Sequence, residues 1–226
     1  MGVPGLPQSG TGQVGLLTGR NAAKVYGRHF GPWVPVPLRT IMMEENILSR
    51  PLRGGLSCVF ANAYPSSFLH LAWTKRPAGP PLAARGAGLL SRTESDLARG
   101  EAVSSEILNT AWRQRLRMPQ IPEITAQEAG GNLARIVERT DLTLFAHYTT
   151  DTAGHQGTMK AAVEALERVD AFLEGLLPAL PRDTLLVMAS DHGNIEDVSQ
   201  GHTRNPTFNL LMGKGAQALG SGLTGI

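Results

Sequence analysis

The chain lacks several features that would place it in a specialised class. Its 226 residues include a single cysteine, Cys58, so a disulfide framework is excluded, and the apolar run Leu56 to Phe60 around it is typical of a core thiol. The 21 Lys and Arg nearly balance the 19 Asp and Glu, so the charge gives no indication of nucleic-acid binding. No stretch reaches the roughly 18 apolar residues of a membrane helix. The N-terminus lacks the basic and apolar regions of a signal peptide, and we therefore expect a soluble protein in the cytoplasm.

The chain does have enough apolar residues for a core. The hydrophobic fraction is 42%, and the length suits one domain, with or without an insertion. A glycine-rich loop at Gly10 to Gly12 is expected to precede a helix from Val14 to Tyr26. A Pro-rich stretch leads to a second helix from Leu38 to Leu48. The short apolar run Leu56 to Ala61 is typical of a buried strand in a parallel sheet.

The segment 75–122 differs in composition from its surroundings. It holds several prolines and glycines, is dotted with arginines and has few long apolar runs. Spaced apolar residues between Glu94 and Trp112 favour short helical pieces. We interpret 75–122 as an insertion into a main domain formed by 1–74 and 123–226. Its role is either a small cap over a site or a packed surface insertion.

After Pro122 the pattern becomes regular and predicts alternating helices and strands. Thr125 and Glu128 have the spacing of a capping box, which marks the start of a helix. Further on, apolar residues recur at three- and four-residue intervals, as they do on one face of a helix. The expected elements are a helix over 125–139, a strand over 142–146, a helix over 158–177 and a buried strand over 184–189.

This order of elements predicts an α/β fold, with a mainly parallel sheet that carries helices on both faces. In such sheets, ligands gather at the carboxyl ends of the strands. Asp151 comes shortly after the first of these two strands, and Asp191 and His192 come directly after the second. The topology is therefore expected to bring the two acidic motifs to the same edge.

Carboxylates and imidazoles at this edge predict a site for two divalent metal ions. A single histidine is a weak signal, but five side chains share the expected edge: Asp151, His155, Asp191, His192 and His202. A loop across Gly154 is expected to fold the first two inward, and Gly201 permits close backbone approach beside the last. Asp oxygen and His nitrogen suit Zn²⁺ or Mn²⁺, and a metal pair about 4 Å apart commonly serves phosphoryl transfer.

Other polar residues are candidates for the same site. His147 lies at a strand end and can reach the metal ligands or a substrate, whereas His29 and His70 are interpreted as structural or exposed. Near the N-terminus, Ser9 or Thr11 stands in a Gly-rich turn that enters a helix, where backbone N–H groups favour an anion. Such a hydroxyl, bound to a metal, becomes a nucleophile. A turn without catalytic duty is the alternative for this loop.

These motifs together resemble the alkaline phosphatase superfamily of metalloenzymes, and within it the cofactor-independent phosphoglycerate mutases. The C-terminal part of the resemblance rests on Ser190-Asp191-His192-Gly193-Asn194, on Glu196 and on Gly201-His202-Thr203. The upstream part rests on Asp151-x-x-Gly154-His155. The resemblance covers residues 1 to about 65 and 123 to 226.

The resemblance also chooses among the N-terminal hydroxyls. Sulfatases and nucleotide pyrophosphatases of this superfamily carry the nucleophile nine residues before a Thr-Gly pair, and the count back from Thr18 reaches Ser9. The mutase register, eleven residues back from Arg20, also gives Ser9. One metal would then be held by Asp151, His155 and His202, and the other by Asp191, His192 and the Ser9 oxygen. The candidates for contacts with these ligands or with a substrate are Thr11, Arg20, His147 and Asn194.

The start of the chain departs from the family pattern. In the family, the second metal has a further aspartate at the end of the first strand, but only eight residues precede Ser9 here and none is acidic. We therefore expect a domain that is truncated at its N-terminus and lacks its first strand and one metal ligand. The segment 75–122 is also much smaller than the transferase domain of a full-length mutase.

The resemblance implies metal-dependent phosphoryl transfer on a small phosphorylated substrate. The chain would act as a phosphomonoester hydrolase or a phosphomutase, with Ser9 as the nucleophile and two ions, Mn²⁺ or Zn²⁺, as cofactors. The alternative is a catalytically impaired relative that acts as a metal-binding or scaffold module.

Overall fold

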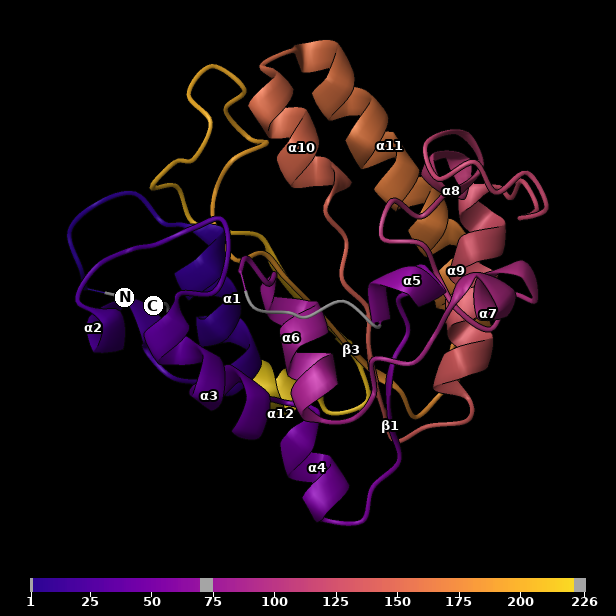
Figure 1. Cartoon of the computed structure of the whole chain (residues 1–226), viewed down its shortest axis with the longest axis horizontal. Helices are drawn as coiled ribbons and strands as arrows, with labels where there is room; N and C mark the ends of the chain where they lie inside the picture. The colour runs from indigo at the N-terminus through magenta and orange to yellow at the C-terminus, as the bar shows by residue number, and fades with distance from the viewer. Residues whose placement is uncertain (1, 70–74, 222–226) are drawn as a thin grey trace.

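Helices surround a small set of short strands in this protein (Figure 1). The computed structural model describes residues 2–69 and 75–221, so His70 lies outside the described residues. The N-terminal helices and α6 stand on one side of the strands, and α5, α7, α8 and α9 stand on the other side. The expected mixture of helices and strands is confirmed.

The N-terminal layer consists of α1 (Ser9–Thr18), α2 (Ala22–Tyr26), α3 (Val36–Glu44) and α4 (Ser49–Arg53). The bounds expected for the first helix are wrong: it begins at Ser9, and it ends where Gly19 adopts a φ of 71°. The expected loop at Gly10 to Gly12 is therefore the first turn of a helix. Its glycines allow close contact with other segments, since a Cβ at Gly10 would lie 2.7 Å from Phe30 O.

The four described strands form two separate pairs. The first pair is parallel and joins β1 (Cys58–Phe60) to β2 (Leu142–Leu144). The second pair is antiparallel and joins β3 (Leu185–Ala189) to β4 (Asn209–Gly213). The expectation of one mainly parallel sheet is therefore not met by the described strands. β3 takes its partner from the returning chain after the 190–208 loop, and a chain that turns back in this way pairs antiparallel.

The β3–β4 pair also differs from the buried strand expected over 184–189. β1 is buried along its whole length, whereas the Val187 side chain of β3 is 57% exposed. Among the described residues, none of the buried apolar clusters contains a side chain of β3 or β4. Apolar composition alone does not bury a strand; a covering layer of helices is needed as well.

The main core is built by α9 (Ala126–Val137) and α11 (Met159–Leu176). The expected capping box opens α9, because the Thr125 and Glu128 side chains each accept a backbone N–H of the other residue. Thr158 caps the start of α11, because its hydroxyl accepts the N–H of Ala161 at 3.3 Å. Phe172 and Leu176 of α11 are buried in this core, each contributing about 1.5–3 kcal/mol.

The apolar face expected on α11 is correct only for its C-terminal half. In the first half, Met159, Val163 and Leu166 are 68%, 43% and 50% exposed, while the buried residues are Ala162 and Ala165. Small side chains face inward there, because the nearby helix α10 (Thr149–Gln156) packs closely against α11.

The middle of the chain contributes α5 (Ser66–Leu69), α6 (Gly79–Gly86), α7 (Glu94–Ala98) and α8 (Thr110–Gln114). α6 packs against α1 and α3, and its Leu82 and Ala83 belong to the same buried cluster as Val14 and Met42. A second cluster joins Trp112 and Ile121 to Ala63, next to β1. The remaining elements are the 3-10 turn η1 (Leu177–Ala179) and the helix α12 (Ala216–Gly220).

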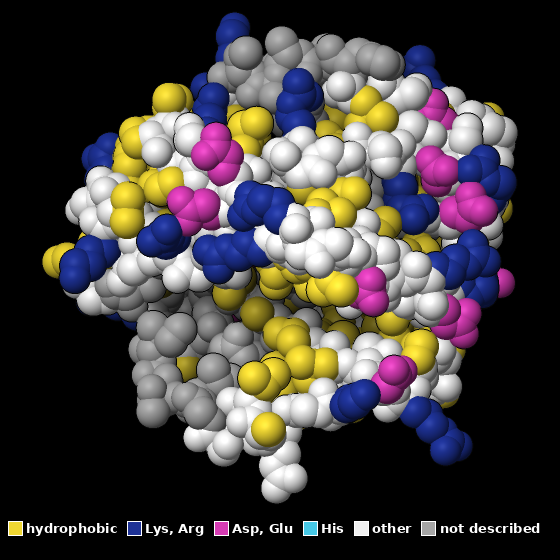
Figure 2. Space-filling view, turned by 90° about the horizontal axis from the view of Figure 1, so that it is seen from below, with side chains coloured by type: hydrophobic (Ala, Val, Ile, Leu, Met, Phe, Trp, Pro, Cys, Tyr) yellow, Lys and Arg dark blue, Asp and Glu magenta, His cyan; other side chains and the backbone are white. Residues whose placement is uncertain are grey.

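One face of the surface shows apolar side chains among scattered charges of both signs (Figure 2). No histidine is visible among the described side chains on this face, so the imidazoles do not emerge there. None of the described helices combines the length and the hydropathy that crossing a bilayer requires.

Candidate metal centre

Three segments that are distant in sequence meet at the candidate site. They are the start of α1, the helix α10 and the loops that follow β3. The Ser9 hydroxyl oxygen lies 2.9 Å from Nε2 of His192, and both residues are buried. α10, after β2, and His192, after β3, thus lie close together, although β2 and β3 belong to different strand pairs and share no sheet edge.

Asp151 and His155 lie on a helix rather than on the expected loop. They occupy positions i and i+4 of α10, which place two side chains on the same face of a helix. Asp151 Oδ1 is 3.4 Å from His155 Nε2, and His155 Nε2 is 3.2 Å from His202 Nε2. The helix continues through Gly154 and ends at Gln156, just before Gly157. Its geometry fixes the spacing of Asp151 and His155.

The ligand atoms of Asp151, His192 and His202 all lie within 4.8 Å of one another. Asp151 Oδ1 is 3.7 Å from His192 Nε2 and 3.8 Å from His202 Nε2. Carboxylate oxygen and imidazole nitrogen at these separations can turn toward one divalent ion, and Zn²⁺ or Mn²⁺ accepts such donors. The donor set therefore fits a metal.

The backbone orients both imidazoles of the site. His202 Nδ1 lies 2.8 Å from Pro7 O, and His192 Nδ1 lies 3.3 Å from Gly193 O. Because a carbonyl only accepts, each Nδ1 carries the proton and donates it, and each Nε2 is left with its lone pair. This is the tautomer that binds a metal, and a fixed second nitrogen is a common feature of metal-binding histidines.

Asn194 holds Asp151 in place. Its Nδ2 donates to Asp151 Oδ1 at 2.8 Å, while its own backbone N–H donates to Glu196 Oε2 at 2.7 Å. Glu196 also accepts the Thr203 hydroxyl and the side-chain amide of Asn205. One carboxylate thus joins the loop after β3 to the loop that carries His202.

Asp191 approaches the cluster from the side of α1. Its Oδ1 lies 3.8 Å from His192 Nε2. Burial raises the pKa of Asp191 above its usual value, although the neighbouring His192 and a hydrogen bond from Gln13 act in the opposite direction. The backbone of Gly12 presses against Asp191, since a Cβ at Gly12 would lie 2.5 Å from Asp191 O and 3.1 Å from its Cβ.

Three candidates make other contacts. Thr11 is buried, and its hydroxyl contacts the backbone of Gln8 and Phe30. Arg20 forms an ion pair with Glu45 at 2.5 Å beyond the far end of α1, about 15 Å from Ser9 along the helix axis. His147 donates from Nδ1 to Ser105 O at 2.9 Å, and burial lowers its pKa to about 4.

The residue patterns did not identify Gln13 and Tyr148. Amide and phenol groups are not part of a metal-ligand motif, and these two residues were noticed only because the fold places them near Asp191. Tyr148 occupies the N-cap position of α10, and its hydroxyl is buried next to that of Tyr64. Burial raises the pKa of Tyr148 well above its usual value, and the neighbouring Tyr64 and Asp191 add to this rise.

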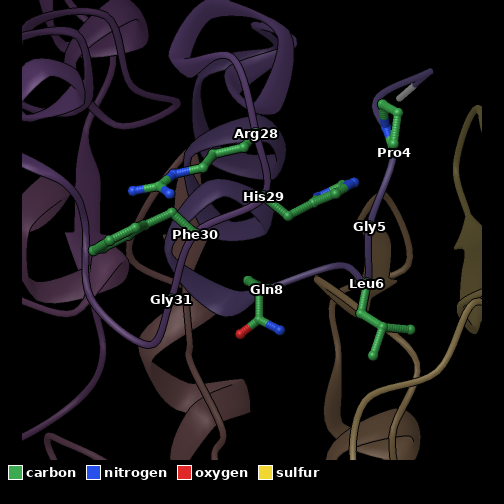
Figure 3. Close-up of a pocket in the computed structure, with 8 residues that line it drawn as sticks. All are labelled: Pro4, Gly5, Leu6, Gln8, Arg28, His29, Phe30 and Gly31. Atoms are coloured by element: carbon green, nitrogen blue, oxygen red, sulfur yellow. The ribbon is translucent and has the colours of Figure 1, made fainter.

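A cavity of about 500 Å³ opens beside the start of α1 (Figure 3). Gln8 lines it together with Leu6 and the 28–31 segment, and the His29 side chain points toward Pro4 and Gly5. Gly31 joins the cavity to the site, because a Cβ added there would lie 3.2 Å from Ser9 N. The cavity wall is thus in contact with the backbone of Ser9.

Comparisons with known proteins find similarity over the C-terminal half of the chain. Residues 119–224 match the family model described as Metalloenzyme superfamily. This range includes Asp151, His155, Asp191, His192 and His202, and it does not include Ser9. The resemblance to this superfamily is therefore confirmed where the five predicted metal ligands lie.

The curated relatives that the chain resembles are phosphoglycerate mutases. A 2,3-bisphosphoglycerate-independent phosphoglycerate mutase of Desulforudis audaxviator is 31% identical over 101 residues, which are 41% of this chain and 20% of the relative. The mutase of the same name from Rhodopseudomonas palustris is 34% identical over 103 residues, with 41% and 20% coverage. That of Helicobacter pylori is 32% identical over 110 residues, with 45% and 22% coverage. The chain spans about a fifth of the length of these relatives. No solved structure matches it.

Proposed function

Because residues 119–224 match the Metalloenzyme superfamily, we propose that this chain carries out metal-dependent phosphoryl transfer with Ser9 as its nucleophile. The substrate in this proposal is a small phosphomonoester, in keeping with the phosphoglycerate mutases that the chain resembles. The phosphoryl group passes to water, as in a phosphatase, or to a second hydroxyl, as in a mutase.

The contact between Ser9 and His192 carries this proposal. A serine hydroxyl is a weak nucleophile unless an adjacent base or cation activates it. Ser9 Oγ lies 2.9 Å from His192 Nε2, close enough for both atoms to bind one cation, and it stands at the N-terminus of a ten-residue helix. The positive end of that helix stabilises an anionic phosphoryl group next to Ser9.

The proposed ligands divide into two sets. Asp151, His155 and His202 would hold one ion, and Asp191, His192 and Ser9 would hold the other. When bound there, the ions would lower the pKa of the Ser9 hydroxyl and neutralise charge on the phosphoryl oxygens. Zn²⁺ and Mn²⁺ both suit these donors.

The chain's own residues account for the remaining steps. Ser9 Oγ attacks phosphorus, the bond from phosphorus to the leaving oxygen breaks, and a phosphoserine and an alcohol result. Water or another hydroxyl then takes the phosphoryl group, and the Ser9 hydroxyl is restored. Asn194 keeps Asp151 oriented throughout, since its amide donates to Oδ1.

The cavity beside Ser9 suits the alcohol part of such a substrate. It is lined by Arg28 and His29, and the first 43 residues of the chain contain no Asp or Glu. This end of the molecule therefore carries a positive excess that favours a phosphorylated ligand over a cationic one.

A metal-binding module without turnover is the second candidate function. The arrangement of the ligand atoms favours it, because Asp151, His192 and His202 cluster within 4.8 Å of one another and Asp191 is not among them, which suits one ion better than two. Binding of one ion without phosphatase activity is the result that this candidate predicts.

The proposal is tested by hydrolysis of p-nitrophenyl phosphate with Mn²⁺ or Zn²⁺ by the full chain. Ser9→Ala is expected to lower the rate by at least about 10³-fold, because it removes the group that attacks phosphorus. Ser91→Ala, at an exposed serine, is the matched control and is expected to retain the rate. Equal rates for Ser9→Ala and the unmodified chain would rule out Ser9 as the nucleophile.

A further inference from the structure

The loop after β3 carries a glutamate that contacts neighbours of two candidate metal ligands. Glu196 is exposed, and it belongs to none of the buried apolar clusters of the described residues. Its carboxylate accepts hydrogen bonds from Asn194 on one side and from Thr203 and Asn205 on the other. Glu196 therefore contributes to the fold through these hydrogen bonds and not through apolar burial.

The first of these contacts leads to Asp151. Glu196 Oε2 accepts the backbone N–H of Asn194 at 2.7 Å, and the side-chain amide of Asn194 donates to Asp151 Oδ1 at 2.8 Å. Asn194 is buried, and a Cβ at Gly154 of α10 would overlap its side chain. The amide is thus enclosed between α10 and the loop, and Glu196 fixes the backbone from which this amide extends.

The second contact leads to His202. Glu196 Oε1 accepts the hydroxyl of Thr203, the residue that directly follows His202. Thr203 is buried, and its backbone N–H donates to Gly193 O at 3.0 Å. The carboxylate and this backbone bond together hold the loop that carries His202 against the loop after β3.

Gly193 makes room for the contact between these loops. A Cβ at Gly193 would overlap Thr203 Oγ1 and would lie 2.6 Å from Glu196 Oε1. Gly193 also directly follows His192 in the chain. The hydroxyl and the carboxylate can therefore meet beside the metal ligands because this position has no side chain.

We propose that Glu196 is a positioning residue that sets the separation between Asp151 and His202. It acts through Asn194 on one side and through Thr203 on the other. This inference rests on the proposed function, in which Asp151 and His202 are metal ligands. Their ligand atoms lie 3.8 Å apart, so a shift of either loop changes the space for an ion. Residues that orient metal ligands in this way commonly change metal affinity by about 10- to 100-fold.

The test measures the metal affinity of the folded chain. Zn²⁺ or Mn²⁺ is titrated calorimetrically into the full chain and into Glu196→Gln. The glutamine amide has one accepting oxygen where the carboxylate has two, so it cannot accept from both Asn194 N and the Thr203 hydroxyl in the same way. Glu196→Gln is expected to weaken metal binding by about 10- to 100-fold.

The matched control is Asp197→Asn. It removes the same charge from the next residue of the loop, whose carboxylate accepts hydrogen bonds from Ser199 and Gln200 and thus stabilises a local turn. Asp197→Asn is expected to retain the metal affinity of the unmodified chain. A loss equal to that of Glu196→Gln would mean that negative charge near the site, and not the position of the loops, sets the affinity.

A second pair of variants acts on the partner of Glu196. Thr203→Val keeps the shape of the side chain but removes the hydroxyl, and it is expected to weaken metal binding, whereas Thr203→Ser keeps the hydroxyl and is expected to retain the affinity. The double variant Glu196→Gln/Thr203→Val is expected to lose less than the sum of the two single losses, because both act on one contact.

Urea unfolding of the metal-free chain separates positioning from a purely structural role. A structural role lowers the metal-free stability and leaves the affinity of the folded molecules unchanged. If Glu196→Gln does not fold, the comparison of Thr203→Val with Thr203→Ser decides.

The outcomes distinguish this inference from the proposed function. Unchanged affinity in both Glu196→Gln and Thr203→Val overturns the role of Glu196 and leaves the metal site standing. Absence of any bound ion in the unmodified chain refutes the proposed function itself, and this inference with it. Equal phosphatase rates of Ser9→Ala and the unmodified chain refute only the nucleophile.

Discussion

Ser9 Oγ and His192 Nε2 lie 2.9 Å apart although 183 residues separate them in the chain. Two backbone contacts hold the segments together at this point. His202 Nδ1 donates to Pro7 O at 2.8 Å, and Gly12 packs on Asp191. The start of α1 is therefore attached to the proposed metal ligands on both sides of Ser9, so changes in the loops that carry Asp191 and His202 are expected to affect the position of the serine.

Metal binding is expected to stabilise the fold. An ion at 100 times its dissociation constant adds about 2.7 kcal/mol to the free energy of unfolding, because it binds the native chain and not the unfolded one. Differential scanning fluorimetry with Zn²⁺ or Mn²⁺, before and after EDTA, measures this as a rise and fall of Tm.

His202→Ala is expected to abolish most of that rise, since it removes a ligand atom at the centre of the cluster. His147→Gln is the control, because His147 donates to Ser105 O and is not one of the clustered residues. An equal rise in Tm for His202→Ala and the unmodified chain would show that the ion binds elsewhere.

Gly154→Ala tests how closely α10 packs on the loop after β3. A Cβ at Gly154 would overlap the Asn194 side chain, whose Nδ2 orients Asp151. The substitution is expected to cost about 1–3 kcal/mol of stability and to lower metal affinity by about 10-fold or more. Urea unfolding and metal titration measure the two effects. Gly131→Ala, in open space on α9, is expected to show neither loss.

The predictable part of this site is the part that carries chemical signatures. Asp151, His155, Asp191, His192 and His202 could be proposed as ligands because metal-binding side chains are few in type and their motifs are short, and the structure brings Asp151, His192 and His202 together. The contact between Gln13 and the backbone of Gly79 was not identified, since glutamine is common in helices and its partner lies 66 residues away. Contacts of this kind follow from packing between α1 and α6, which a single sequence does not reveal.

In the fold, too, local sequence signals predicted some elements, whereas elements that depend on tertiary contacts were missed. The helix at Thr125 followed from a local capping box, and the buried strand β1 followed from a short apolar run. The antiparallel partner of β3 did not, because pairing depends on where the chain returns after a loop of about twenty residues. The helical start of α1 was missed as well: Gly10 and Gly12 disfavour a helix locally, and tertiary contacts with Phe30 and Asp191 override that preference.

His147 is expected to make stability depend on pH. Burial lowers its pKa to about 4, with Arg168 adding to this effect, while its hydrogen bond to Ser105 opposes it. Between pH 4 and the ordinary histidine pKa of about 6.5, the unfolded chain binds a proton that the native chain does not. The free energy of unfolding therefore falls as the pH drops through this window, by on the order of 1–3 kcal/mol.

His147→Gln removes the titrating group and keeps a side-chain donor for Ser105 O. Urea unfolding at several values between pH 7 and pH 4 is expected to show a smaller fall for the variant than for the unmodified chain. Parallel curves for the two proteins contradict the assignment of this pH dependence to His147.

The α9–α11 interface provides a test of packing with two neighbouring glycines. A Cβ at Gly130 would meet Phe172 O and lie 2.7 Å from Leu176 N, whereas a Cβ at Gly131 meets only the end of Arg135. Gly130→Ala is expected to destabilise the fold by about 1–3 kcal/mol, because the backbones of two packed helices must separate. Gly131→Ala is expected to stabilise it by up to about 1 kcal/mol, since alanine has the higher helix propensity. Urea unfolding of both variants measures the difference, and equal effects of the same sign would mean that α9 and α11 do not approach each other at Gly130.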